Sequence, residues 1–172
     1  NDITIAAGEA ASDDGTDIMV LSSAITKQMD FGWAVGTNAG GLNTGSEAAS
    51  TWYEVHLIKR ADTGVVDVMF TTTANRATLP TNYTLKRRIG WIRNNASSAI
   101  LQFTQVDDYF TLTTQVNDVA VSKTVTATAV TLTAPPSSIA RFRATADMST
   151  SVNANSVIVF SEIAEGYVTP AL

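Results

Sequence analysis

The chain has 172 residues, with 11 Lys and Arg against 16 Asp and Glu and a formal net charge of −5. This length suits one domain with a real core, and the acidic balance disfavours nucleic acid as a general partner because phosphate binding needs a basic face. The absence of cysteine excludes disulfides and thiolate zinc sites, and no apolar run is long enough to predict insertion into a membrane.

The N-terminal part is predicted to form short strands joined by loops. Strands are expected at 2–7 and 17–22, with a turn-rich loop at 8–15 between them. Residues 24–30 form either a strand or one or two helical turns, because their periodicity does not decide. Residues 32–50 contain five glycines and are predicted to be a loop.

Residues 51–73 predict a β-hairpin. A four-residue turn at 61–64 sets Val55 opposite Phe70 and Leu57 opposite Val68 on one apolar face. The other face is mixed and is expected to be the wetter one. It carries Trp52, Glu54, His56 and Ile58 opposite Asp67, Met69, Thr71 and Thr73.

The remaining strands complete a predicted all-β fold. The abundance of Thr, 25 residues, favours pleated and half-exposed surface. About ten short strands with turn signals predict an antiparallel β-sandwich, jelly-roll-like, as a single domain over 1–172. These later strands are expected at 84–93, 100–106, 109–114, 119–133 (with a β-bulge near Ala129 and Val130), 139–146 and 156–163.

The sequence predicts no catalytic or metal site and no cofactor. His56 is the one histidine, and no G-x-S-x-G motif accompanies it, so a strand histidine satisfied by a neighbour is favoured over a catalytic triad. Paired carboxylates of the kind that glycoside cleavage requires are not evident. The oxygen-rich segment 12–17 lacks the EF-hand calcium pattern and indicates a solvated turn.

Three consecutive basic residues, Lys86, Arg87 and Arg88, lie on the strand predicted at 84–93. Alternation sends Lys86 and Arg88 to one face and Arg87 to the other. The cluster either protects a sheet edge and pairs with neighbouring carboxylates, or forms a subunit contact with an acidic strip on another copy.

Aromatic and amide side chains in loops suggest a ligand surface. Aromatic rings stack on the apolar faces of sugars, and Asn side chains bind hydroxyl groups. Core packing is the commoner role of each aromatic residue. The candidates for ligand contact are Trp33, Asn38, Asn43, Asn94 and Asn95.

Four segments together resemble a domain found in structural proteins of tailed bacteriophages and prophages, often tail-fibre or tail-spike proteins. They are NDITIAAGEA, ITKQMDFGWAVGTNAGGLNTGS, TWYEVHLIKRADTGVVDVMFTTT and LPTNYTLKRRIGWI, so the resemblance covers residues 1–92. It implies a β-rich virion module, usually multimeric, and transfers no catalytic residues. By analogy with phage fibres, the chain is expected to form a homotrimer and to contact other virion proteins.

The sequence is consistent with three functions. The first is a tail-fibre or spike module, not an enzyme, that binds a host-surface glycan or protein. The second is a capsid decoration, collar or baseplate protein with only intersubunit contacts, and the third is a polysaccharide depolymerase. The expected location is the virion, assembled in the bacterial cytoplasm. The start at Asn1, without the features of a signal peptide, suggests a processed chain or an excised domain.

Overall fold

The computed structural model describes residues 1–107, 109–114, 116–118, 130–136 and 138–139. Contacts divide the chain into two compact units, Asn1–Gln115 and Val116–Leu172. In the described part of the second unit, Asp118 accepts hydrogen bonds from the backbone and the hydroxyl of Thr133. The predicted strand at 156–163, and most of those predicted at 119–133 and 139–146, lie outside the described residues.

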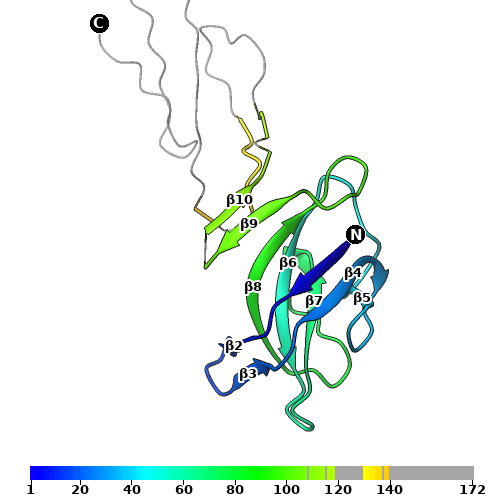
Figure 1. Cartoon of the computed structure of the whole chain (residues 1–172), viewed down its shortest axis with the longest axis vertical. Coiled ribbons are helices and arrows are strands. Elements are labelled where there is room, and N and C mark those ends of the chain that lie inside the picture. The colour runs from blue at the N-terminus through cyan, green and yellow to red at the C-terminus, as the bar shows by residue number, and fades with distance from the viewer. Residues whose placement is uncertain (108, 115, 119–129, 137, 140–172) are drawn as a thin grey trace, which may run out of the picture. The chain divides into compact units, whose positions relative to one another are not determined.

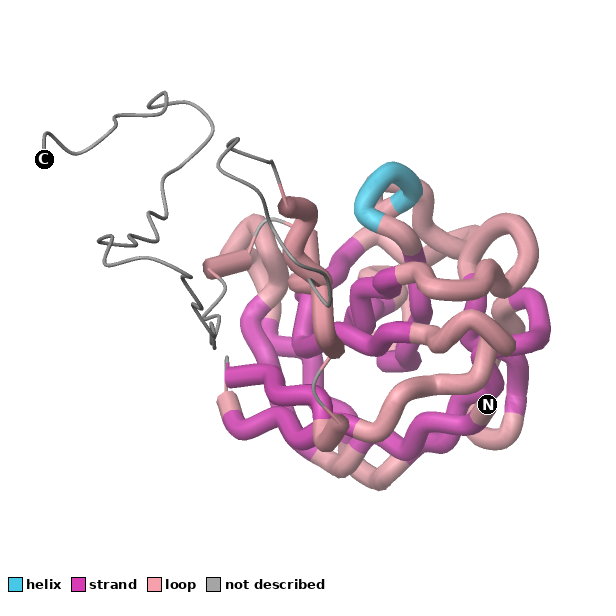
Figure 2. Tube along the Cα trace, turned by 90° about the horizontal axis from the view of Figure 1, so that it is seen from above, coloured by secondary structure: helices cyan, strands magenta, loops and turns pink. Residues whose placement is uncertain are grey.

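The first unit is all-β, as predicted. Its one helical element in the described residues is a single 3-10 turn, η1 (Thr73–Asn75), drawn in cyan in Figure 2. No helix among these residues has the length and apolar character needed to cross a membrane. The strands are β1 (Asp2–Ile5), β2 (Gly8–Ala11), β3 (Ile18–Leu21), β4 (Ile25–Gly32), β5 (Ala39–Leu42), β6 (Trp52–Lys59), β7 (Val66–Thr71), β8 (Leu85–Arg93), β9 (Phe103–Val106) and β10 (Tyr109–Leu112).

Six strands form one curled sheet in the order β1-β4-β5-β7-β6-β8 (Figure 1). This sheet is mixed, because β5 pairs in parallel with both β4 and β7, so the prediction of purely antiparallel strands is wrong here. Two antiparallel hairpins, β2–β3 and β9–β10, complete the unit.

Strand prediction succeeded where apolar alternation was strong and failed where it was weak. The ambiguous segment at 24–30 is a strand, β4. The loops predicted at 8–15 and 32–50 contain β2 and β5, whose sequences GEAA and AGGL carry little β propensity. These two strands depend on the partners that they meet rather than on their own residues.

The predicted hairpin is confirmed down to its register. Val55 lies opposite Phe70, Leu57 opposite Val68 and Lys59 opposite Val66. The apolar face packs into the main core, which also takes Met19 and Leu21 from β3, Ile25 and Met29 from β4, and Ile92 from β8.

The expectation that the second face of the hairpin is the wetter one is wrong. Glu54, His56, Asp67 and Thr71 are all at most 2% exposed. Ile58 and Met69 on this face form a second apolar cluster with Tyr83, against which Trp33 and Leu79 pack. Loops therefore cover this face, and its polar groups must find partners inside the protein.

A buried ion pair underlies the tight crossover from β4 to β5. The Lys27 ammonium lies 2.9 Å from Asp67 Oδ1 and donates to the carbonyls of Ala34 and Gly36. The second carboxylate oxygen of Asp67 accepts a 2.7 Å hydrogen bond from the Gly36 amide. Residues 33–38 are thus tied across this face of the sheet, in a connection shorter than the crossover that usually joins parallel strands. Burial lowers the pKa of Lys27, although Asp67 opposes this shift.

Candidate functional site

The outer face of β6 and β8 gathers basic and aromatic side chains. Cross-strand pairing sets Trp52 opposite Arg93, Glu54 opposite Trp91 and His56 opposite Arg88. The register shifts between Val55 and His56, so β8 contains a β-bulge at this point. We call this surface the basic–aromatic face. It consists of Trp52, Arg76, Lys86, Arg88 and Arg93, together with Trp91, whose side chain is buried beneath Arg88.

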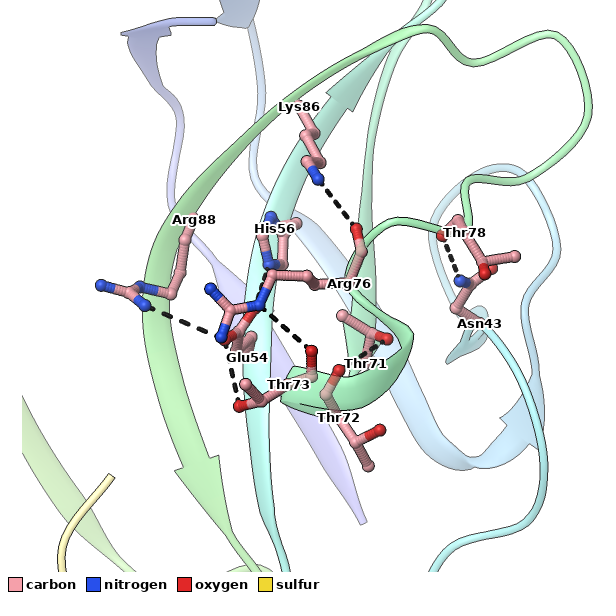
Figure 3. Close-up of polar contacts among 10 residues, drawn as sticks. All are labelled: Asn43, Glu54, His56, Thr71, Thr72, Thr73, Arg76, Thr78, Lys86 and Arg88. Carbon is pink, nitrogen blue, oxygen red and sulfur yellow. Dashed lines mark hydrogen bonds and ion pairs between the residues drawn. The ribbon is translucent and has the colours of Figure 1, made fainter. Parts of the chain in front are cut away.

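Glu54 lies fully buried at the centre of the face (Figure 3). Its Oε2 accepts a 2.7 Å hydrogen bond from His56 Nε2, and its Oε1 accepts one of 3.2 Å from the Thr73 hydroxyl. Two guanidinium groups approach the same Oε1, Arg76 at 3.2 Å and Arg88 at 3.8 Å. The negative charge of this carboxylate is therefore balanced by groups from three elements: its own strand β6, the η1 turn and β8.

Arg76 is held in place from several sides. Its Nε donates to the Thr73 carbonyl at 3.1 Å, and its own carbonyl accepts a 2.9 Å hydrogen bond from the Lys86 ammonium. Figure 3 shows the arginine directed at Glu54 from the η1 segment. The contacts with the Thr73 carbonyl and Glu54 orient the side chain, and the Lys86 contact anchors its backbone, which lowers the entropy lost when the arginine binds another group.

Arginine and tryptophan alternate along the face. The Arg88 guanidinium lies 4.8 Å from the Trp91 ring centre, and that of Arg93 lies 5.7 Å from Trp52. The two tryptophan rings meet edge to face at 6.4 Å. Such cation–π contacts place positive charge over apolar rings without neutralising it.

His56 has one buried ring nitrogen without a partner. Because Nε2 donates to Glu54, Nδ1 is an unprotonated acceptor in the neutral ring, and no hydrogen bond reaches it. Burial lowers the pKa of His56 and the Lys86 charge lowers it further, whereas Glu54 and Asp13 raise it. The net direction favours a neutral ring.

The free energy of unfolding is therefore expected to fall as the pH drops below the ordinary histidine pKa of 6.5. The unfolded chain takes up a proton there that the buried ring resists, so the folded state loses its advantage. Because His56 is the one histidine, His56→Gln should remove most of the dependence between pH 7.5 and pH 5.5. Urea denaturation at several pH values measures how the free energy of unfolding depends on pH. An unchanged slope in the variant would contradict the assignment.

The predicted ligand residues are spread over the unit. Trp33 is half-buried, donates from Nε1 to the Val68 carbonyl at 2.9 Å and meets Tyr83 edge to face. Asn38 is exposed at a positive φ of 57° beside the start of β4. Asn43 follows β5 and donates to the Thr78 carbonyl at 2.5 Å (Figure 3).

The other two predicted ligand residues follow β8. Asn94 is fully buried and donates to Glu47 at 2.8 Å, while its Oδ1 has no partner. Asn95 caps the turn after it by accepting from the backbone amides of Ser97 and Ala99. The end of the sheet where β4, β5 and β8 finish carries Trp33, Asn43, Asn94 and Asn95. Asn38 lies at the opposite end, directly before β5.

The basic cluster divides between the two faces of β8, as alternation predicted. Arg87 lies 3.9 Å from Asp13, a residue of the β2–β3 turn, and is half-exposed. Lys86 and Arg88 belong to the basic–aromatic face. Glu54 and Arg76 were not predicted as site residues. Alternation along β6 could have drawn attention to Glu54, whereas nothing near Arg76 in the sequence indicates its partner.

Comparison with protein-family models, with curated proteins and with solved structures finds no match. The described residues also contain no group of three or more His, Cys, Asp and Glu side chains that could hold a metal ion.

Proposed function

We propose that this chain is a module of a tailed-bacteriophage particle, a tail-fibre or spike domain, that binds a host-surface glycan or protein. The observation that supports a recognition role is the basic–aromatic face, where Arg88, Arg93 and the two Trp side chains stand on the paired strands β6 and β8 and Arg76 joins them from the end of η1. Rigid strands hold binding groups more precisely than loops do. The resemblance of residues 1–92 to phage structural proteins supports the location.

The module is proposed to lack enzymatic activity. Glu54 and His56 are the acid–base pair of the face, and they are 0% and 2% exposed. A general acid or base must come within hydrogen-bond distance of the substrate. Here the two side chains bond to each other beneath Arg76 and Arg88, an arrangement that suits support of the arginines better than catalysis.

The test combines location and binding. Antibodies against the purified chain should label the tails of phage particles from a bacterial lysate that contains the chain, in negative-stain electron microscopy. The fluorescently labelled chain should bind to arrays of bacterial surface polysaccharides or to host cells. Labelling of the tail with no binding in either assay would replace the receptor role with a purely structural one, and absence from the particle would overturn the proposal.

The second candidate is a capsid decoration, collar or baseplate protein with only intersubunit contacts. The observation that favours it is β3, where Ile18 and Val20 share one side and are each 51% exposed.

In either case we propose a homotrimer, assembled with other virion proteins in the bacterial cytoplasm. Light scattering that shows a monomer at micromolar concentration would remove the trimer. We also propose that residues 1–172 form a jelly-roll-like β-sandwich.

A further inference from the structure

Positive charge is distributed unevenly over the described residues. Four of the basic side chains have a carboxylate of their own, at 2.6–3.9 Å. The pairs are Lys27–Asp67, Lys59–Asp17, Arg60–Asp62 and Arg87–Asp13. The other four, Arg76, Lys86, Arg88 and Arg93, have only Glu54 among them. The basic–aromatic face therefore carries a surplus of positive charge on an acidic chain.

Neutralising Glu54 does not account for this surplus. One guanidinium, with the His56 and Thr73 hydrogen bonds, would suffice for a single carboxylate. Lys86 makes no contact with Glu54, since its ammonium binds the Arg76 carbonyl. Arg88 reaches the carboxylate only at 3.8 Å and lies mainly against Trp91.

Donors on the two arginines remain available to solvent. The side chains of Arg76 and Arg88 are 38% and 39% exposed, although both reach toward a buried carboxylate. A guanidinium has five N–H donors in a planar fork that matches a carboxylate or phosphate. Glu54 contacts both guanidinium groups from the buried side of the face, so they are oriented before a ligand binds.

We infer that Arg76, Lys86 and Arg88 bind the carboxylate groups of an acidic polysaccharide, with a sugar ring against the part of Trp52 that its neighbours Trp91, Phe110 and Arg93 leave exposed. The inference rests on the proposed recognition function and names its ligand class. Arginine forks pair with uronic-acid carboxylates, and an aromatic ring stacks on the apolar face of the sugar. Glu54 acts as a positioning residue, because it has no surface for the ligand to contact.

The test uses the full-length chain and two polymers that share a backbone. Polygalacturonate carries a carboxylate on each sugar, and its fully methyl-esterified form carries none. Biolayer interferometry should detect binding of polygalacturonate and at least tenfold weaker binding of the ester, since a hydrogen bond to a charged group is stronger than one to a neutral ester. Binding should also weaken as NaCl is raised from 50 to 300 mM.

Arg88→Gln and Lys86→Gln should each weaken polygalacturonate binding by about tenfold. Arg60→Gln is the matched control, because it removes the same charge from a turn where Asp62 pairs with the arginine at 2.7 Å. Glu54→Gln tests the positioning role and should weaken binding even though it makes the face more positive. Circular dichroism on each variant confirms folding.

The outcomes separate the inference from the function on which it rests. Equal binding of the two polymers, equal effects of Arg88→Gln and Arg60→Gln, or no binding of polygalacturonate at millimolar sugar would overturn the inference. If the chain then still bound uncharged glycans or host cells, the proposed recognition function would stand. If it bound neither, both would fall.

Discussion

Replacing Lys27 with Met is expected to lower the free energy of unfolding by about 3–5 kcal/mol, because it leaves a buried carboxylate without its counter-ion. The ammonium lies 2.9 Å from Asp67, and the two side chains are 0% and 1% exposed. Met preserves the length and apolar stem of the lysine, so the change isolates the charge. The carbonyls of Ala34 and Gly36 also lose their donor. Denaturation in urea, followed by tryptophan fluorescence, measures the effect.

Two further variants give this prediction its controls. Lys27→Met combined with Asp67→Asn removes both charges and keeps an acceptor for the Gly36 amide, so it should recover a large part of the loss. Arg60→Gln breaks an exposed pair and should change the free energy of unfolding little, because solvent screens that pair. If Lys27→Met cost no more than Arg60→Gln, the ion pair would have no special role in holding the crossover.

Gly40→Ala is expected to lower the free energy of unfolding by about 2–3 kcal/mol, because there is no space for a side chain between β4 and β5. An added Cβ would lie 2.0 Å from the Gly32 carbonyl oxygen and 2.7 Å from that of Phe31. Both obstacles are backbone atoms, so the clash cannot be relieved by turning a side chain. The strands would have to separate, and the parallel pairing of β5 would weaken. Thermal and urea denaturation both report the loss.

Gly32→Ala is the matched control on the neighbouring strand. A Cβ there would meet nothing within 4 Å, and the backbone conformation is one that any residue adopts. Its expected effect is within about 0.5 kcal/mol. Similar losses for the two alanine variants would show that glycine flexibility, rather than close approach of the strands, accounts for both.

The hairpin of β6 and β7 could be predicted because its information is local. Asp62 and Gly64 supply the turn, with Gly64 at a positive φ of 74°, and side-chain alternation then determines which residues face each other. The β8 strand followed from the same alternation, including the opposite directions of Arg87 and Arg88. These features need only neighbours in the sequence, so a single chain is enough to predict them.

The candidate site could be predicted only in part, because its residues come together from separate parts of the sequence. Arg88 and Lys86 were recognised as a basic cluster, but their relation to Glu54 depends on the pairing of β6 with β8. Arg76 reaches the same carboxylate from a connection with no strand signal. Asn43 and Asn94 are predicted ligand groups, and in the structure both donate hydrogen bonds that tie loops together.

The sequence by itself thus determined an all-β chain, the hairpin and its register, and the basic cluster on β8, because composition and alternation are properties of neighbouring residues. Only the tertiary structure decided that β5 enters the sheet in parallel. Its glycines leave no room for a Cβ, because Gly40 lies against the Gly32 backbone and Gly41 against the Phe70 ring. The tertiary structure also decided that the second face of the hairpin is buried. Loop 33–38 and the η1 segment cover it, and charges that alternation would leave in water become internal ion pairs, because they must find partners once water is excluded.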